Sequence, residues 1–111
     1  MSSVVVITLP AKIDIIRNAK WWSDNHSGIQ AAEWLDAVET QIMTLNLHPE
    51  SHPLAVENPR FKIDLREKLV GLGSRPNYRA IYTITGLEIQ VLRVISASQD
   101  ELMSGDLAGW S

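Results

Sequence analysis

The feature that most constrains the fold is a seam of apolar residues between residues 28 and 46. Its members are spaced four, three, four and three positions apart: Ala31, Leu35, Val38, Ile42 and Leu45. Because an α-helix repeats every 3.6 residues, this spacing places them on one face. Ser27 is suited to cap the start of this helix. We interpret the seam as core packing rather than as a cofactor site, so another element must cover it.

A second helix is expected directly before this one. The β-branched run from Val4 to Leu9 reads as a strand, and Pro10 suits the first turn of a helix that extends to about Asn25. We expect one face of this helix to carry an apolar stripe, with Ile15, Ala19 and Trp22 beside it. That stripe comprises Leu9, Ile13, Ile16 and Lys20. Because a short break separates the two helices, they are predicted to form an antiparallel hairpin in which each helix covers the apolar face of the other, so the stripe is expected to point inward.

From Phe61 onward the apolar residues alternate with a period of two, which indicates strands. The first strand is expected over residues 61–69, the second over 78–85 and the third over 87–95, with Gly86 in the turn between the last two. The third strand is apolar on both faces, which predicts a central or covered position. One face is expected to hold Ile89, Val91 and Ile95, and the other Leu92 and Val94. Residues 98–107 form either a short C-terminal helix or a tail.

The order strand, helix, helix, strand, strand, strand indicates an α+β fold. We predict an N-terminal strand and a helical hairpin packed on a mostly antiparallel four-stranded sheet. The 111 residues, 45% of them hydrophobic, fit a single domain over residues 1–111. The Pro-rich stretch from Leu47 to Pro59 is expected to be a loop within it.

Several classes of chemistry are disfavoured. Without cysteine the chain has no disulfides, thiol nucleophile or thiolate metal site. His48 and His52 are each followed by proline, which forbids the helix that would bring them together, so no metal site is expected. The fragment Gly71–Gly73 lacks the lysine of a phosphate loop. No cofactor is expected.

Neither a leader peptide nor a membrane span is expected. The apolar run at the N-terminus is short and has no basic region before it. No apolar run approaches the length of a transmembrane helix. These features predict a cytoplasmic protein without a membrane partner.

Charge is distributed unevenly along the chain. The net charge is −3, yet residues 60–79 contain six bases and two acids. On one strand face, Lys62, Asp64, Arg66 and Lys68 would project together. Tyr78 and Tyr82 share a face, and Arg79 points to the opposite one. Such a face could bind a phosphate backbone or an acidic partner, or could be a solvated face that protects an edge strand, and the pattern leaves these alternatives open.

Motifs spread along most of the chain resemble those of the RelE/ParE superfamily of bacterial toxins. They are Pro10-Ala11 with Asp14-Ile15, then Leu65-Arg66, Gly71-Leu72-Gly73, Tyr78-Arg79 with Tyr82, the run from Ile89 to Val94, and Gln99-Asp100. The resemblance covers about residues 4 to 102. It implies a toxin of a type II toxin–antitoxin pair, often called a plasmid stabilisation protein, whose growth inhibition is neutralised by a cognate antitoxin that packs against the hairpin and sheet.

Two activities divide this superfamily: RelE-like members cleave mRNA, and ParE-like members poison DNA gyrase. RelE-like ribonucleases carry basic residues, and often Tyr or His, after the last strand. Here the corresponding residues are Ser96 to Glu101, with no base and no histidine. This departure and the overall acidity favour the ParE-like branch and a binding protein over an enzyme.

Three functions follow as hypotheses: a ParE-like toxin that binds gyrase, a ribosome-dependent mRNA endonuclease, and a non-toxic interaction module. An endonuclease would use Arg79, Lys68 and Arg66 on the phosphate. The wider set expected to bind a target or phosphate is Lys62, Arg66, Lys68, Arg75, Tyr78, Arg79 and Tyr82. Arg79 could instead be structural, for example paired with Asp100. Direct nucleic-acid binding and a homodimer stay open.

Tryptophans on the two helices are candidates for a partner surface. At least one of Trp21, Trp22 and Trp34 is expected to pack in the core or between the helices. Any exposed one would mark a patch covered by the antitoxin or a second copy of the chain. Trp110 has no assigned role.

Overall fold

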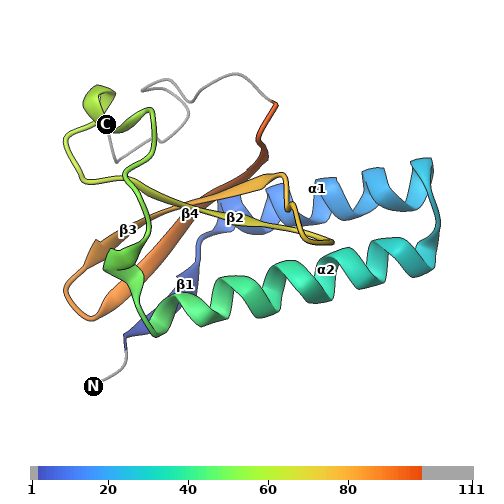
Figure 1. Cartoon of the computed structure of the whole chain (residues 1–111), viewed down its shortest axis with the longest axis horizontal. Helices are drawn as coiled ribbons and strands as arrows, with labels where there is room; N and C mark the ends of the chain where they lie inside the picture. The colour runs from blue at the N-terminus through green and yellow to red at the C-terminus, as the bar shows by residue number, and fades with distance from the viewer. Residues whose placement is uncertain (1–2, 99–111) are drawn as a thin grey trace.

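The computed structural model describes residues 3–98 and has the predicted α+β architecture (Figure 1). Strand β1 (Val4–Ile7) leads into helices α1 (Leu9–Asn25) and α2 (Gly28–Met43). Strands β2 (Arg66–Val70), β3 (Tyr78–Thr85) and β4 (Glu88–Ser96) follow a loop with three short 3₁₀ turns at Thr44–Asn46, Pro49–Ser51 and Asn58–Arg60. The expected C-terminal helix over residues 98–107 lies almost wholly outside the described residues.

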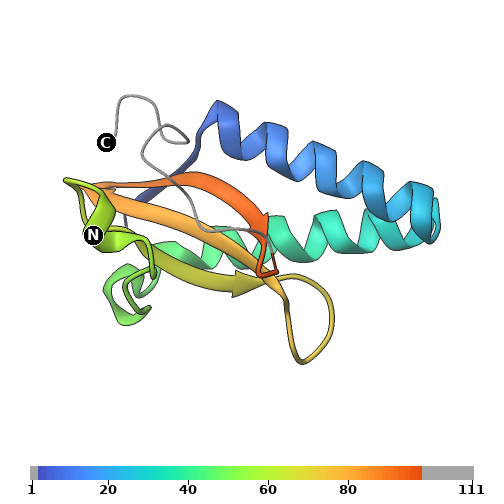
Figure 2. The ribbon, with the colours of Figure 1, turned by 90° about the horizontal axis from the view of Figure 1, so that it is seen from above.

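The four strands form one mixed sheet in the order β1-β4-β3-β2. β1 pairs with β4 in parallel, and the other two pairings are antiparallel. β4 is therefore internal, as its two apolar faces predicted. The two helices run antiparallel and lie along one side of the sheet (Figure 2).

The seam of α2 forms the centre of the main core. Val38, Ile42 and Leu45 are fully buried against residues of the sheet. Trp34, which the seam did not include, is also fully buried, and its ring packs edge-on against Tyr78 at 5.0 Å between centroids. Ser27 caps the helix, since its Oγ accepts a hydrogen bond from the backbone N–H of Gln30 at 3.1 Å.

The expected inward face of α1 was wrong. Ala11 and Ile15 are buried, whereas the stripe that includes Leu9, Ile13 and Ile16 is exposed. The reason is Asp14, whose buried carboxylate must face the sheet to meet its partners there. Fixing Asp14 inward turns the apolar stripe of the helix toward solvent.

Asp14 binds a β-bulge in β4. Its Oδ2 accepts from Arg93 Nε at 2.6 Å and from the Val94 N–H at 2.9 Å, and its Oδ1 accepts from Arg93 Nη2 at 3.0 Å. In the register with β3, Ile81 is opposite Arg93 and Tyr82 is opposite Val91, so Leu92 is the extra residue. Helix α1 is thereby anchored to an irregular point of the sheet.

The bulge also changes which residues of β4 share a face. Ile89, Val91 and Val94 join the core under the helices, whereas Leu92 and Ile95 join a second core on the other face. The expected grouping of Ile95 with Ile89, and of Val94 with Leu92, was therefore wrong. Strict alternation fails because one inserted residue reverses the side-chain direction beyond it.

The first predicted strand is shorter than expected. Residues 61–65 belong to the loop, and β2 begins at Arg66. Phe61 and Leu65 are buried in the second core. The backbone of Leu65 bonds to the loop itself, with its N–H donating to Asn58 Oδ1 at 2.7 Å and its carbonyl accepting from the Ala55 N–H at 2.7 Å. The alternation there reflects a loop packed over the sheet.

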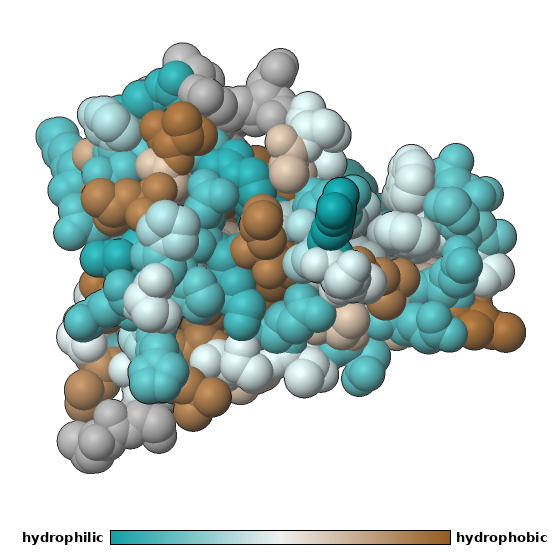
Figure 3. Space-filling model, viewed as in Figure 1, coloured by the Kyte–Doolittle hydropathy of each residue, from teal (hydrophilic) through white to brown (hydrophobic). Residues whose placement is uncertain are grey.

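The surface seen in Figure 3 is mixed, with hydrophobic patches separated by hydrophilic residues. Of the three helical tryptophans, Trp34 is fully buried, Trp22 is partly buried and Trp21 is about half exposed. Trp22 Nε1 donates to the hydroxyl of Tyr78 at 3.2 Å. Trp110 lies outside the described residues.

Candidate functional site

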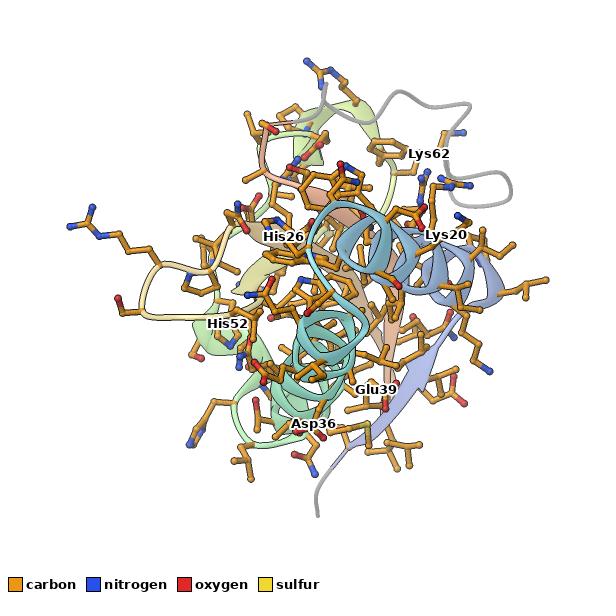
Figure 4. The ribbon with its side chains drawn as sticks, turned by 90° about the vertical axis from the view of Figure 1, so that its right-hand side faces the viewer. Lys20, His26, Asp36, Glu39, His52 and Lys62 are labelled. Atoms are coloured by element: carbon orange, nitrogen blue, oxygen red, sulfur yellow. The ribbon has the colours of Figure 1, made fainter. Side chains whose placement is uncertain are left out.

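Folding divides the predicted site residues between the two faces of the sheet. The register places Arg66 opposite Tyr82 and Lys68 opposite Ala80, on the face that carries the helices. Arg79 points to the other face, as expected. Lys62 and Arg75 lie in loops before and after β2 and are exposed. Lys62 also lies well apart from His52, whose ring contacts that of Tyr82 (Figure 4). Because Arg79 points away from Arg66 and Lys68, the bases of residues 60–79 do not form one continuous face.

On the face of the sheet that carries the helices, side chains of β2 and β3 bind the loop that follows α2. Arg66 Nη1 donates to the backbone carbonyls of His52 at 2.8 Å and Glu50 at 3.2 Å. The hydroxyl of Tyr82 donates to the carbonyl of Pro49. Both side chains are thereby committed to positioning this loop.

Lys68 and His52 complete a group that we call the β2-edge cluster: Arg66, Lys68, His52 and Tyr82. Lys68 Nζ donates to Thr44 Oγ1 at 2.8 Å, and the rings of His52 and Tyr82 meet edge to face at 6.3 Å. Because β2 is an outer strand of the sheet, this cluster lies along its edge.

Burial sets the protonation states in this cluster. Burial, with a smaller contribution from the charge of Lys68, lowers the pKa of His52. Burial also lowers the pKa of Lys68 and raises the pKa of the Tyr82 hydroxyl to about 12. At neutral pH the cluster therefore offers a lysine cation beside a neutral imidazole, while the phenol keeps its proton.

On the opposite face, Arg79 forms what we call the far-face triad with Glu57 and Glu67. Arg79 Nη1 donates to Glu57 Oε2 at 2.9 Å, and Nη2 donates to Glu57 Oε1 and to Glu67 Oε1, the latter at 3.0 Å. Glu57 is fully buried and Arg79 is nearly so. The hydrogen bonds that Arg79 donates to Glu57 are the main cause that raises the pKa of Arg79. The triad joins the loop to strands β2 and β3.

Sequence reasoning missed both carboxylates of this triad. Glu67 faces the same side as Arg79 on the neighbouring strand, so strand pairing could have suggested it. Glu57 lies in an irregular loop whose path no periodicity indicates. Asp100, the alternative partner suggested by sequence, lies outside the described residues.

Neither arrangement has the features of a metal site or of a nucleophile with its base. Among residues 3–98 there is no group of three His, Cys, Asp or Glu side chains that could hold a metal ion. In the same part of the chain, no helix is long and apolar enough to cross a membrane. The chemistry that remains is anion binding by Lys68 and the exposed bases, and proton transfer at His52.

Comparisons with known proteins agree with this fold. A search of curated proteins finds no match. A solved structure described as the chromosomal ParDE TA system from P. aeruginosa superposes with a TM-score of 0.73 at 17% identity, covering 87% of this chain and 98% of that one. The family model for the ParE toxin of type II toxin–antitoxin system, parDE, matches residues 5–101. The chain therefore belongs to the ParE toxin family of type II toxin–antitoxin systems.

Proposed function

We propose that this toxin arrests growth by binding a macromolecular target, with DNA gyrase the leading candidate, and that a cognate antitoxin neutralises it in the cytoplasm. The observation that carries the proposal is the far-face triad. Arg79 occupies the Tyr-Arg position of the family pattern, and its guanidinium is bound by two carboxylates. An arginine held in this way is poorly placed to stabilise a scissile phosphate.

The exposed bases are the better candidates for target contact. Lys62 and Arg75 project from loops on either side of β2 and are exposed, whereas Lys68 on the outer strand is half-buried and donates to Thr44. Exposed cations of this kind steer an anionic partner without catalysing a reaction on it. Lys62→Ala with Arg75→Ala should therefore weaken toxicity without lowering stability.

A second candidate function, mRNA cleavage, is favoured by one observation. His52 has a lowered pKa and lies near Lys68, so a neutral base and a cation occur together. In a ribonuclease such a pair could remove a proton and hold a phosphate. The third hypothesis, a non-toxic interaction module, predicts neither activity.

Induced expression in bacteria separates these functions. A gyrase poison should stop growth, trigger a DNA-damage response and block supercoiling by purified gyrase, and co-expression of the protein encoded by the adjacent reading frame should restore growth. Mapping of the 5′ ends of message on programmed ribosomes tests for cleavage. The variant His52→Gln, which lacks the proposed base, should not cleave. Toxicity with cut message and normal supercoiling would refute the gyrase proposal, and normal growth would refute both toxic functions.

A further inference from the structure

A hollow of about 430 Å³ lies between the second half of α1 and the point where β3 begins and β4 ends. Asn18, Trp21 and Trp22 line it from the helix, where spacings of three and four positions put them on one side. Tyr78 and Ser96, which pair across the two strands, line it from the sheet. The volume of the hollow lies within the range of small-molecule sites.

The described residues that line this hollow include no acid and no base. The two bases of α1 that are closest to it in sequence already have acidic partners. Lys20 Nζ lies 2.6 Å from Asp24 Oδ2. Arg17 Nη1 lies 3.7 Å from Asp14 Oδ1. The hollow is therefore suited to an uncharged group rather than to a phosphate or an ammonium ion.

Two tryptophan rings line the hollow at right angles to each other. The centroids of Trp21 and Trp22 are 5.5 Å apart, and the angle between the ring planes is 86°. Trp22 is held in place, because its Nε1 donates to the Tyr78 hydroxyl at 3.2 Å and its ring stacks on His26 at the end of α1 (Figure 4). Trp21 is 49% exposed. A flat ligand that stacks on one ring therefore meets the edge of the other, and both are contacts that aromatic groups favour.

Two polar groups of the hollow have hydrogen-bonding capacity that the described residues do not use. Tyr78 is only 6% exposed, and its hydroxyl accepts from Trp22, whereas no residue among 3–98 accepts the hydroxyl hydrogen. The amide nitrogen of Asn18 donates to the carbonyls of Asp14 at 2.9 Å and Val94 at 3.3 Å, which leaves Oδ1 of Asn18 as an acceptor. The hollow therefore offers one donor and one acceptor whose positions are set by the bonds that these side chains already make.

We propose that this hollow binds an adenine base. Adenine is flat and uncharged, and its N6 amino group and N7 are a donor and an acceptor side by side on one edge. The amino group would donate to Asn18 Oδ1 and N7 would accept from the Tyr78 hydroxyl, while a face of the base stacks on Trp21. A free nucleoside and an unpaired base of a single-stranded nucleic acid present the same group.

A sugar fits this lining less well than adenine does. A sugar ring carries several hydroxyl groups, and each needs a hydrogen-bond partner when it is buried. The hollow offers the single donor of Tyr78 and the single acceptor of Asn18 in fixed positions. The two tryptophan rings, in contrast, supply the flat contact area that a base uses.

The test measures the affinity of the purified toxin for adenosine by calorimetry. The wild type should bind adenosine with a Kd of about 1 mM or tighter. Inosine, which has an oxygen in place of the amino group, should bind about tenfold more weakly, because its oxygen cannot donate to Asn18 Oδ1. Trp21→Ala should weaken adenosine binding by about tenfold or more through the loss of stacking. Tyr78→Phe, which keeps the ring and removes the hydroxyl, should weaken it by about tenfold.

Ile16→Ala is the matched control, because Ile16 lies on the same helix, is 68% exposed and does not line the hollow. It should keep the wild-type affinity for adenosine. Trp21 is about half exposed, so the melting temperature of Trp21→Ala by circular dichroism should match that of the wild type. A loss of binding in that variant then reports the site and not the fold.

A ten-nucleotide oligodeoxyadenylate separates the two sources of the base. Tighter binding of the oligonucleotide than of adenosine, weakened by Trp21→Ala, would assign the site to single-stranded nucleic acid, and comparable affinities would assign it to a free nucleoside. The inference would be overturned if the wild type bound neither probe, if inosine bound as tightly as adenosine, or if Trp21→Ala kept the wild-type affinity. Binding of glucose in place of adenosine would assign the hollow to sugars and would also overturn it.

Discussion

Glu57→Gln tests whether the far-face triad holds the loop onto the sheet. The substitution keeps the shape of the side chain and removes a charge that is fully buried beside Arg79. Removing one partner of a buried ion pair costs about 3–5 kcal/mol, because the other charge is left buried with poorer compensation. Glu67 stays as a second partner for Arg79, so we expect the lower end, about 3 kcal/mol.

Urea denaturation measures this loss directly. In a domain of this size, whose total stability is about 5–15 kcal/mol, a loss of 3 kcal/mol should lower the Tm by roughly 13 °C. The urea dependence of the unfolding free energy should not change, since the surface exposed on unfolding is the same. Glu50→Gln, on the exposed part of the same loop, is the matched control and should change stability by less than about 0.5 kcal/mol.

A double-mutant cycle separates ion pairing from general loop damage. Arg79→Gln alone removes the guanidinium that both carboxylates bind, whereas Glu57→Gln combined with Arg79→Gln removes both members of the closest pair. The loss in the double variant should be smaller than the sum of the single losses by more than about 1 kcal/mol. Additive losses, or a loss below about 1 kcal/mol for Glu57→Gln, would refute the structural role of the triad.

Three further predictions concern single groups. The pKa of His52, measured by NMR titration, should lie below 6.5 and should rise in Lys68→Gln. Because a lowered pKa in the folded state means that the unfolded state binds more protons, stability should fall as the pH drops below 6.5. His52→Gln should remove this part of the pH dependence of stability. Asp14→Asn should cost about 2–4 kcal/mol in urea denaturation, since it removes the buried charge that binds Arg93 and the Val94 N–H, and a loss under 1 kcal/mol would contradict the proposed anchor. Gly86→Ala should cost about 1 kcal/mol, because φ is +61° there in otherwise open space, whereas Gly28→Ala at the start of α2 should be neutral or stabilising; equal effects at both positions would contradict this reason.

The sequence predicted the fold well because the fold rests on periodicity. The seam of α2, the turn at Gly86 and the doubly apolar β4 each arise from regular repeats, and the structure confirms all three. The errors occur where a single interaction overrides a repeat. Asp14 turns α1 away from its apolar stripe, and the bulge at Leu92 reverses the direction of later side chains in β4.

The candidate site was harder to predict because its partners are far apart in sequence. Arg79 was placed on the correct face by the period of two, yet its partner Glu57 is 22 residues away in a loop without regular structure. The carbonyls that bind Arg66 belong to the same kind of segment. Neighbours within a strand or helix follow from the sequence, whereas contacts made by a folded loop depend on its tertiary path.

The distribution of charge in space differs from its distribution along the chain, and this difference changes which surface is the better candidate for recognition. Residues 60–79 form the most basic segment, but folding buries Arg79 between carboxylates and commits Arg66 to loop carbonyls. The bases of α1 are separated in sequence and do not form a basic run along the chain. Lys12 and Arg17 are five positions apart, so the helix places them on opposite sides of one exposed apolar stripe, where Arg17 lies 3.7 Å from Asp14. A run of like charges loses much of its effect when strands alternate their side chains between faces, whereas scattered charges on a helix can be gathered onto one face. For this toxin, the bases that folding leaves exposed, such as Lys62 and Arg75, are therefore better candidates for recognition of a partner than Arg66 and Arg79.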